Sequence, residues 1–176
     1  MTRNLGGTEL KRLHREWRRN TNHKLALMLD GVQNPFNLGS ILRTAAAYSV
    51  DHLWLVGSPS PNDAKVQKTA LGSQKFVTTT SCETSASALS AAHAAGYRVI
   101  GIELAEGAVP LHETDLSGDV CIVMGHEDRG LSKDLLAGAD ALAFIPQLGK
   151  IGSLNVGTAT AIALYETRRA EWTSAD

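Results

Sequence analysis

The chain has 176 residues, 43% of them hydrophobic and 20% charged, and these proportions fit one compact domain rather than a multidomain protein. Lysine and arginine number 17 against 18 acidic residues, so the formal net charge of −1 gives no sign of a nucleic-acid partner. Two cysteines are too few for a disulfide framework, and 5% aromatic residues argue against a platform for stacked bases.

The charge is unevenly distributed along the chain. Residues 1–24 contain seven basic and two acidic residues, whereas the remainder is acidic in balance. No apolar stretch approaches the roughly 18 residues that a membrane span needs, and the beginning of the chain lacks the apolar core of a signal peptide. The sequence therefore predicts a basic arm on a mildly acidic body, in a cytoplasmic protein without a membrane partner.

The first predicted element is an amphipathic helix from Glu9 to Asn20, with Thr8 as a candidate N-cap. Its apolar side chains follow a helical spacing and its other face is basic. The apolar stripe could dock on the body or on a partner chain, and the basic face could contact phosphate or simply be solvated. We expect residues 1–23 to form an N-terminal extension and residues 24–176 to form the main domain.

From Lys24 onward, short apolar runs alternate with helical patterns. The predicted strands are Leu25–Leu29, His52–Val56, Arg98–Glu103, Val120–Met124 and Ala141–Ile145. The predicted helices are Leu38–Ala47, Ala64–Leu71, Thr84–Ala95, Ser132–Leu136 and Leu154–Arg169. Strands that are apolar on both faces and alternate with helices predict an α/β fold, with a mostly parallel sheet flanked by helices.

Ligands of parallel sheets bind beyond the carboxyl ends of the strands, so the loops at those ends are candidates for chemistry. The first such loop, from Asp30 to Asn37, leads into a helix that Asn37 is placed to cap, with Arg43 further along a polar face. Taken alone, this pattern also fits a simple helix cap followed by a surface cation.

The second loop, from Gly125 to Leu131, encloses four polar residues between two glycines, which suits close approach of the backbone to a ligand. His126 and Glu127 lack the H-E-x-x-H spacing of a zinc site, so no metal is expected, and Glu127 also fits a purely structural turn carboxylate.

The third loop, from Ile145 to Thr158, lacks the lysine of a phosphate-binding loop. The glycine fingerprint of dinucleotide enzymes and the G-x-S-x-G elbow of hydrolases are also missing from the sequence. These absences weigh against a nucleotide hydrolase, an oxidoreductase and a serine hydrolase.

In order, these three loops resemble the three motifs of the SpoU (TrmH-type) family of RNA ribose 2′-O-methyltransferases, in the SPOUT superfamily. The matching stretches are PFNLGSILRTA, MGHEDRGL and IPQLGKIGSLNVGTATAIALYE. The resemblance implies a C-terminal deep trefoil knot, a homodimer, and S-adenosylmethionine bound in the knot. It also implies an RNA substrate laid across the dimer.

The resemblance also assigns roles to single residues. The catalytic positions it implies are Asn37, Arg43, Glu127, Ser153 and Asn155. The cofactor positions are Glu103, Leu104, Met124, Gly125, Ile145, Pro146, Ser153 and Leu154. We expect the arm to bind RNA through Arg12, Arg15, Arg18 and Arg19, together with Arg43.

The short segment before the first strand favours a tRNA substrate over rRNA, with a guanosine of the D-loop as a candidate target. A noncatalytic RNA-binding dimer that retains the knot is a third alternative. For Arg43 the family mechanism implies a proton acceptor, but a guanidinium is ordinarily always protonated. A clamp on phosphate and on the developing oxyanion is physically easier.

Overall fold

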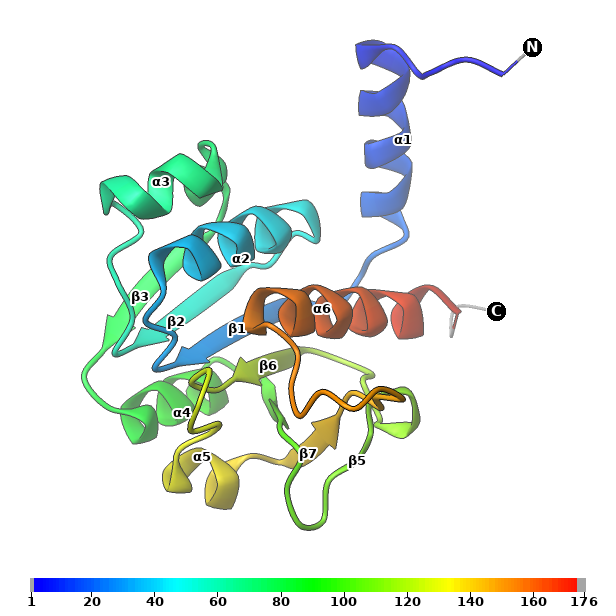
Figure 1. Ribbon diagram of the computed structural model, residues 1–176. Helices are drawn as coiled ribbons and strands as arrows, with labels where there is room; N and C mark the ends of the chain where they lie inside the picture. The colour runs from blue at the N-terminus through cyan, green and yellow to red at the C-terminus, as the bar shows by residue number, and fades with distance from the viewer. Residues whose placement is uncertain (1, 174–176) are drawn as a thin grey trace.

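The structure is a computed structural model that describes residues 2–173 as a parallel sheet with helices on both faces (Figure 1). The strands are β1 (Leu25–Asp30), β2 (His52–Val56), β3 (Thr78–Cys82), β4 (Arg98–Ile102), β5 (Val109–Pro110), β6 (Val120–Met124) and β7 (Ala141–Phe144). They lie in the order β3-β2-β1-β6-β4-β7-β5, and each neighbouring pair is parallel. The predicted α/β fold is thereby confirmed.

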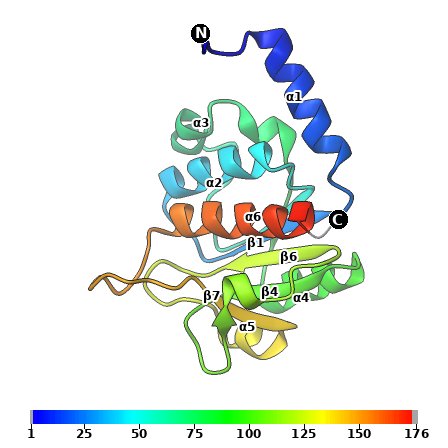
Figure 2. The same cartoon turned by 90° about the vertical axis from the view of Figure 1, so that its right-hand side faces the viewer.

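Six α-helices and two short 3-10 helices connect these strands within the described residues. They are α1 (Gly7–Arg19), α2 (Pro35–Ala47), α3 (Ala64–Ala70), η1 (Ser73–Phe76), α4 (Ser85–Ala94), η2 (Leu111–Glu113), α5 (Lys133–Gly138) and α6 (Val156–Thr173). Helices α3, α2 and α6 lie side by side as one layer over the sheet, and α4 and α5 cover the opposite face (Figure 2).

The alternation of side chains along β1 divides the core between these two layers. Leu25, Leu27 and Leu29 pack in the cluster that includes α2 and α6, whereas Ala26 and Met28 pack in the cluster of α4 and α5. Every residue of β1 and β6 is buried, because these strands lie in the middle of the sheet under helices on both faces. Burial of each leucine contributes roughly 1.5–3 kcal/mol to folding, so the centre of the sheet is its most stable part.

Strand β3, at the edge of the sheet, was not predicted from the sequence. Its residues TTTSC are polar and largely exposed, and the strand pairs with β2 alone. An exposed edge strand carries no apolar run, so only the β-branched threonines point to a strand here.

Two predicted helix caps are wrong. The chain enters α1 at Gly6, whose backbone N–H donates to the Glu9 carboxylate at 2.8 Å, so Thr8 lies inside the helix. Helix α2 is capped by Asn34, whose side chain accepts a hydrogen bond from Phe36 N at 2.9 Å. The sequence Asn-Pro suits a cap followed by the first helical residue, and it leaves the Asn37 side chain available for other contacts.

Helix α1 extends away from the body and contains no buried residue (Figures 1 and 2). At its base the ring of Trp17 contacts that of Trp172 on α6, with centroids 4.7 Å apart. The buried Arg168 of α6 donates hydrogen bonds to the carbonyl oxygens of His23, Tyr48 and Ser49. Helix α6 thus fixes the start of β1, while most of α1 stays in solvent.

No helix among residues 2–173 is long and apolar enough to cross a membrane.

Candidate active site

Three polar side chains from distant parts of the chain meet beside the carboxyl ends of β1 and β6. The Asn37 amide nitrogen on α2 donates to Glu127 Oε1 at 3.0 Å, and the Asn155 amide nitrogen donates to Asn37 Oδ1 at 3.1 Å. We call Asn37, Glu127 and Asn155 the polar clasp. It joins three of the five predicted catalytic residues and holds together the loops that follow β1, β6 and β7.

Asn155 also forms the start of α6. Its Oδ1 accepts hydrogen bonds from the backbone N–H groups of Gly157 at 2.9 Å and Thr158 at 3.2 Å. Two of the otherwise unpaired amides at the start of the helix are thereby satisfied. Both the oxygen and the nitrogen of the Asn155 amide therefore form hydrogen bonds, and this fixes the orientation of the nitrogen toward Asn37.

Glu127 is partly buried in the clasp. Its burial acts to raise the pKa of the carboxyl group, but hydrogen bonds from the Asn37 side chain and from backbone N–H groups outweigh that effect and lower the pKa below its ordinary value. At neutral pH Glu127 is thus an ionised acceptor, and it can orient a hydrogen-bond donor.

The loop after β6 is a tight turn closed by two backbone hydrogen bonds between His126 and Gly130, at 3.0 and 2.9 Å. A Cβ atom on Gly125 would lie 2.3 Å from the carbonyl carbon of Gly130, so only glycine fits there. The Glu103 carboxylate, after β4, accepts a hydrogen bond from Leu131 N at 3.1 Å and braces the same turn.

A cavity of about 840 Å³ opens between the loops that follow β4, β6 and β7. Its walls include Glu127 of the clasp and, among the predicted cofactor residues, Glu103, Leu104, Met124, Gly125, Ile145, Ser153 and Leu154. Pro146, also predicted beside the cofactor, is exposed and is not among the residues that line the cavity. The structure adds further lining residues that the motifs did not single out, namely Ile102, Phe144, Gln147, Ile151, Val156 and Ala159.

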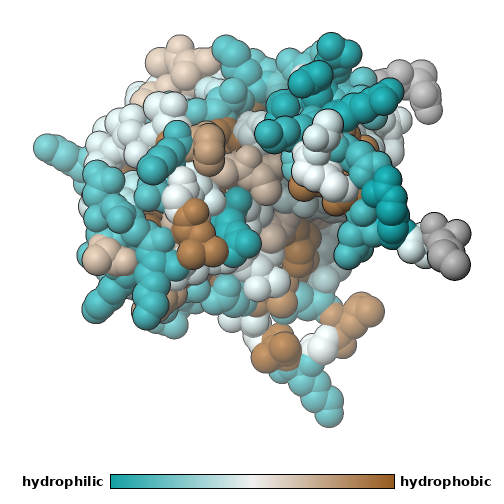
Figure 3. Space-filling view, turned by 90° about the horizontal axis from the view of Figure 1, so that it is seen from above, coloured by the Kyte–Doolittle hydropathy of each residue, from teal (hydrophilic) through white to brown (hydrophobic). Residues whose placement is uncertain are grey.

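The segment before α6 forms one wall of this cavity and projects from the body (Figure 2). Its Leu148 side chain is fully exposed and Ile151 is 72% exposed. Apolar side chains stand out on this projection from a largely hydrophilic surface (Figure 3). Ile151 lines the cavity together with the apolar Phe144 and Ile145, and such side chains suit the flat faces of a heterocyclic ring, while the polar groups of the cavity suit charged and hydroxyl groups.

The cavity lies at the carboxyl edge of a parallel sheet, and the sequence profile of the SpoU rRNA Methylase family matches residues 24–165, which include all of its walls. The chain belongs to the SpoU methylase family.

Individual relatives agree with this membership. The chain is 36% identical over 157 residues to the 23S rRNA (guanosine-2′-O-)-methyltransferase RlmB of Acinetobacter baylyi, covering 85% of this chain and 61% of that protein. It is 32% identical over 145 residues to the tRNA (guanosine(18)-2′-O)-methyltransferase of Escherichia coli, covering 82% of this chain and 63% of the relative. It thus spans about three fifths of these curated relatives.

Among solved structures, the chain is similar to the AdoMet-bound rRNA methyltransferase of Sinorhizobium meliloti. The TM-score is 0.78 at 33% identity, with 86% of this chain and 58% of the other covered. The likeness therefore extends over most of the chain.

Arg43 of the first SpoU motif lies outside the cavity in the single chain. Its side chain is exposed, and within residues 2–173 it makes no hydrogen bond or ion pair. It belongs to an exposed stripe of α2 that faces away from the sheet, formed by Phe36, Ser40, Arg43 and Ala47. The single chain therefore unites the polar clasp and the cavity but leaves this arginine free for a ligand or for a second chain.

Apart from Arg43 on α2, the predicted RNA-binding arginines lie on α1. Arg12 pairs with Glu16 at 3.3 Å, whereas Arg15, Arg18 and Arg19 are exposed and form no ion pair within the described residues. Across residues 2–173, no group of three or more His, Cys, Asp or Glu side chains is arranged to hold a metal ion.

Proposed function

We propose that this SpoU family member is an S-adenosylmethionine-dependent RNA methyltransferase that methylates a ribose 2′-hydroxyl of tRNA. One observation carries the proposal: Glu127 belongs both to the wall of the 840 Å³ cavity and to the polar clasp, so ligand pocket and polar machinery are continuous. A bound cofactor and a ribose held at the clasp would be neighbours.

The residues of the cavity fit S-adenosylmethionine, which is the cofactor. Gly125 leaves room where any side chain would collide with the turn, so the backbone of that loop can lie close against a ligand. Glu103 and Glu127 line the cavity, and their carboxylates would suit the cationic and hydroxyl groups of the cofactor. When bound, the cofactor supplies an electrophilic methyl group.

The chain's own residues then have to align and activate a weak nucleophile. Asn37, held by Glu127 and Asn155, presents an oriented amide toward the ribose. Arg43 grips the 5′ phosphate and donates hydrogen bonds to the developing oxyanion. Because its guanidinium stays protonated, the hydroxyl proton leaves through water or phosphate rather than through Arg43. Ser153, which is exposed at the cavity wall, helps to shape the turn beside the cofactor.

We infer that a homodimer brings Arg43 to a reaction centre. The outer faces of α2 and α6 expose two parallel stripes, and both contain apolar side chains: Phe36 on α2, and Ile162 and Tyr165 on α6. These residues are 52%, 38% and 48% exposed, which is costly for a surface that stays in water. Packing of two such layers across a twofold axis would cover them and direct each Arg43 toward the partner's clasp.

The proposal extends to the trefoil knot and to the division of the chain. Helix α6 follows β7 and packs against α2 and β6 in the middle of the sheet, which is compatible with a knotted path. Residues 1–23 would form a basic RNA-binding extension, and residues 24–176 the methyltransferase domain.

For the substrate, the exposed arginines of α1 support a long, phosphate-rich ligand, and the similarity to the E. coli tRNA enzyme is compatible with tRNA. The similarity to RlmB makes ribosomal RNA the second candidate.

The test is methyl transfer from labelled S-adenosylmethionine to total tRNA and, separately, to ribosomal RNA. We expect a labelled 2′-O-methyl nucleotide in tRNA. Arg43→Ala should abolish transfer and leave cofactor affinity within about twofold, whereas Lys133→Ala, on the opposite face of the sheet, should behave like the parent. Label in ribosomal RNA alone would show that the substrate is ribosomal RNA rather than tRNA. Full turnover by Arg43→Ala would refute the role of this arginine.

A further inference from the structure

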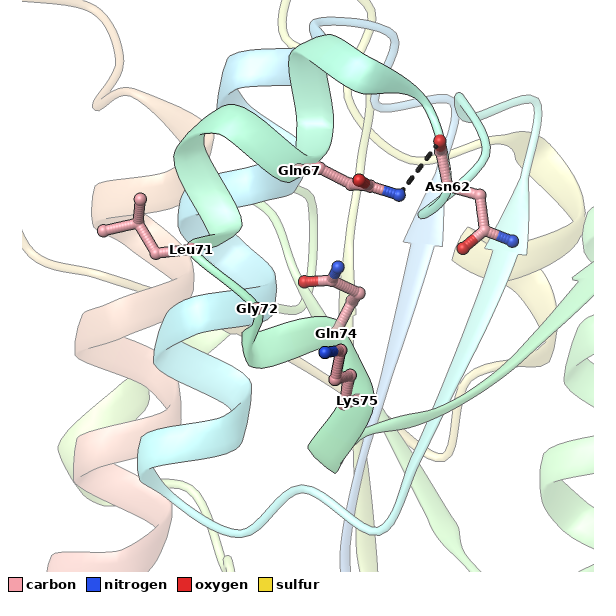
Figure 4. Close-up of a pocket in the computed structure, with 6 residues that line it drawn as sticks. All are labelled: Asn62, Gln67, Leu71, Gly72, Gln74 and Lys75. Atoms are coloured by element: carbon pink, nitrogen blue, oxygen red, sulfur yellow. Dashed lines mark hydrogen bonds between the residues drawn. The ribbon is translucent and has the colours of Figure 1, made fainter.

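A second hollow lies between α3, η1 and the loop after β2, and it shares no residue with the cofactor cavity (Figure 4). Its volume is about 620 Å³, within the range of about 300–1,000 Å³ that is usual for small-ligand sites. Asn62, Gln67, Leu71, Gly72, Gln74 and Lys75 line it. Three carboxamides and one ammonium group therefore converge on a space that the SpoU motifs do not explain.

The carboxamides of this hollow have unused hydrogen-bonding capacity. Gln67 Nε2 donates to the backbone carbonyl of Asn62 at 3.2 Å, which orients the side chain and leaves its Oε1 for another donor. Gln74 Oε1 is buried and has no partner among the described residues. Buried polar atoms are ordinarily hydrogen-bonded to protein or to water, so this oxygen keeps the capacity to accept a hydrogen bond.

The segment around the hollow carries cationic and exposed apolar side chains, of which Lys75 and Leu71 line the hollow itself. Residues 62–76 contain three lysines, at positions 65, 68 and 75, against the single carboxylate of Asp63. That carboxylate is already used as the N-cap of α3, where it accepts a hydrogen bond from Lys65 N at 2.7 Å. Beside the lysines, Leu71 and Phe76 are 68% and 78% exposed. An anionic ligand with a flat ring would match both features.

The hollow is also rigidly placed relative to the reaction centre. The loop after β2 is the neighbour of the loop after β1, because the two strands are paired. Helix α3 packs so closely on α2 that a Cβ atom on Gly39 would lie 2.6 Å from the carbonyl oxygen of Val66. Helix α2 carries Asn37 and Arg43, so the hollow keeps a fixed position relative to these two side chains.

We propose that this hollow binds an unpaired nucleotide of the RNA substrate, at a position other than the ribose that receives the methyl group. Carboxamides pair with the donor and acceptor edges of bases, and sequence-specific recognition of RNA uses unstacked bases held in this way. Lys75 would contact the backbone phosphate of the same nucleotide, and Phe76 would offer a ring against its base. This inference rests on the proposed function, to which it adds a specificity subsite.

The test uses the full chain and the double variant Gln67→Ala/Lys75→Ala, which changes two exposed side chains and no residue of the clasp or the cofactor cavity. We expect KM for the RNA to rise about tenfold, with kcat and cofactor affinity unchanged. The slope of log affinity against log salt should fall by about 0.7–0.9, the contribution of one phosphate contact. Lys133→Ala is the matched control and should leave KM and the salt slope at the parental values.

A cross-linking measurement locates the contact directly. RNA that contains 4-thiouridine should cross-link to the peptide 62–76 of the parent protein, and the double variant should lose that adduct. If the parent methylates RNA while the double variant keeps the parental KM and no adduct maps to 62–76, the subsite is refuted and the proposed function stands. If the parent binds the cofactor and neither binds nor methylates RNA, the proposed function fails and the subsite with it.

Discussion

Replacing Gly125 by alanine tests whether the turn after β6 forms the wall of a cofactor site. The added Cβ would lie 2.3 Å from the carbonyl carbon of Gly130 and 2.5 Å from Leu131 N, and both contacts are with backbone rather than with a movable side chain. The turn must therefore change shape. It lines the cavity directly, so the change alters the site as well as the fold.

The magnitude follows from the two ways in which the turn can respond. If it keeps its shape, the overpacking costs about 1–3 kcal/mol. If it opens, the two hydrogen bonds between His126 and Gly130 are lost, at about 0.5–1.5 kcal/mol each. Both routes predict a loss of about 1–3 kcal/mol in the free energy of unfolding. Cofactor affinity should fall at least tenfold, since about 1.4 kcal/mol at the site corresponds to a factor of ten.

Gly149→Ala is the matched control. Gly149 lines the same cavity, but a Cβ atom there would come no closer than 3.6 Å to another atom, so stability and affinity should stay close to the parental values. Calorimetric titration with S-adenosylmethionine and urea unfolding measure the two effects. If Gly125→Ala binds the cofactor within twofold of the parent and unfolds at the same urea concentration, the close approach of this turn does not matter and the reasoning is wrong.

Three further outcomes follow from other parts of the structure. Arg15→Ala combined with Arg18→Ala on α1 should weaken RNA binding and flatten its salt slope by about 1.4–1.8, whereas an unchanged slope would indicate a purely structural arm. Arg168→Leu strips three backbone carbonyls of their buried donor and should lower the free energy of unfolding by about 3–5 kcal/mol. Arg169→Leu, which breaks a more exposed pair, should lower the free energy of unfolding much less, and equal losses in urea would contradict the assignment. Burial and then nearby negative charges raise the pKa of Tyr97 to about 12 from 10.0. The stability that the neutral phenol contributes is thus complete below pH 10 and is lost as pH rises through about 12. Subtracting the ultraviolet titration curve of Tyr97→Phe from that of the parent isolates this tyrosine, and a transition near pH 10 in the difference would contradict the prediction.

The sequence was sufficient for those parts of the fold that follow from hydrophobic pattern. The buried strands at the centre of the sheet are apolar on both faces, which only a sheet covered by two helical layers can satisfy. Strand β3 escaped prediction because an edge strand that is half in water needs no apolar residues. The cap of α2 was assigned three residues too late, because Asn34 and Asn37 both suit a cap and the following Pro35 was not used to choose between them.

The candidate site was predictable as a set of loops but not as a geometry. The motifs placed Asn37, Glu127 and Asn155 at strand ends, yet no local pattern reveals that Asn37 contacts side chains 90 and 118 positions away in the chain. Long-range contacts are set by the order of strands in the sheet, which the sequence does not state.

The polar clasp also explains why a reaction centre would be built from two amides and one carboxylate. Asn155 accepts from the first turn of α6 through its oxygen and donates to Asn37 through its nitrogen, and Asn37 passes the same polarity on to Glu127. Each amide accepts a hydrogen bond through its oxygen and donates one through its nitrogen, so the hydrogen bonds all run in one direction and end at the carboxylate. Of the three side chains of the polar clasp, ionised Glu127 is the one that only accepts hydrogen bonds. Its lowered pKa keeps the carboxylate ionised at neutral pH. Protonation of Glu127 in acid would reduce its capacity to accept at the end of the chain, so the low-pH limb of activity should follow the ionisation of this one carboxylate.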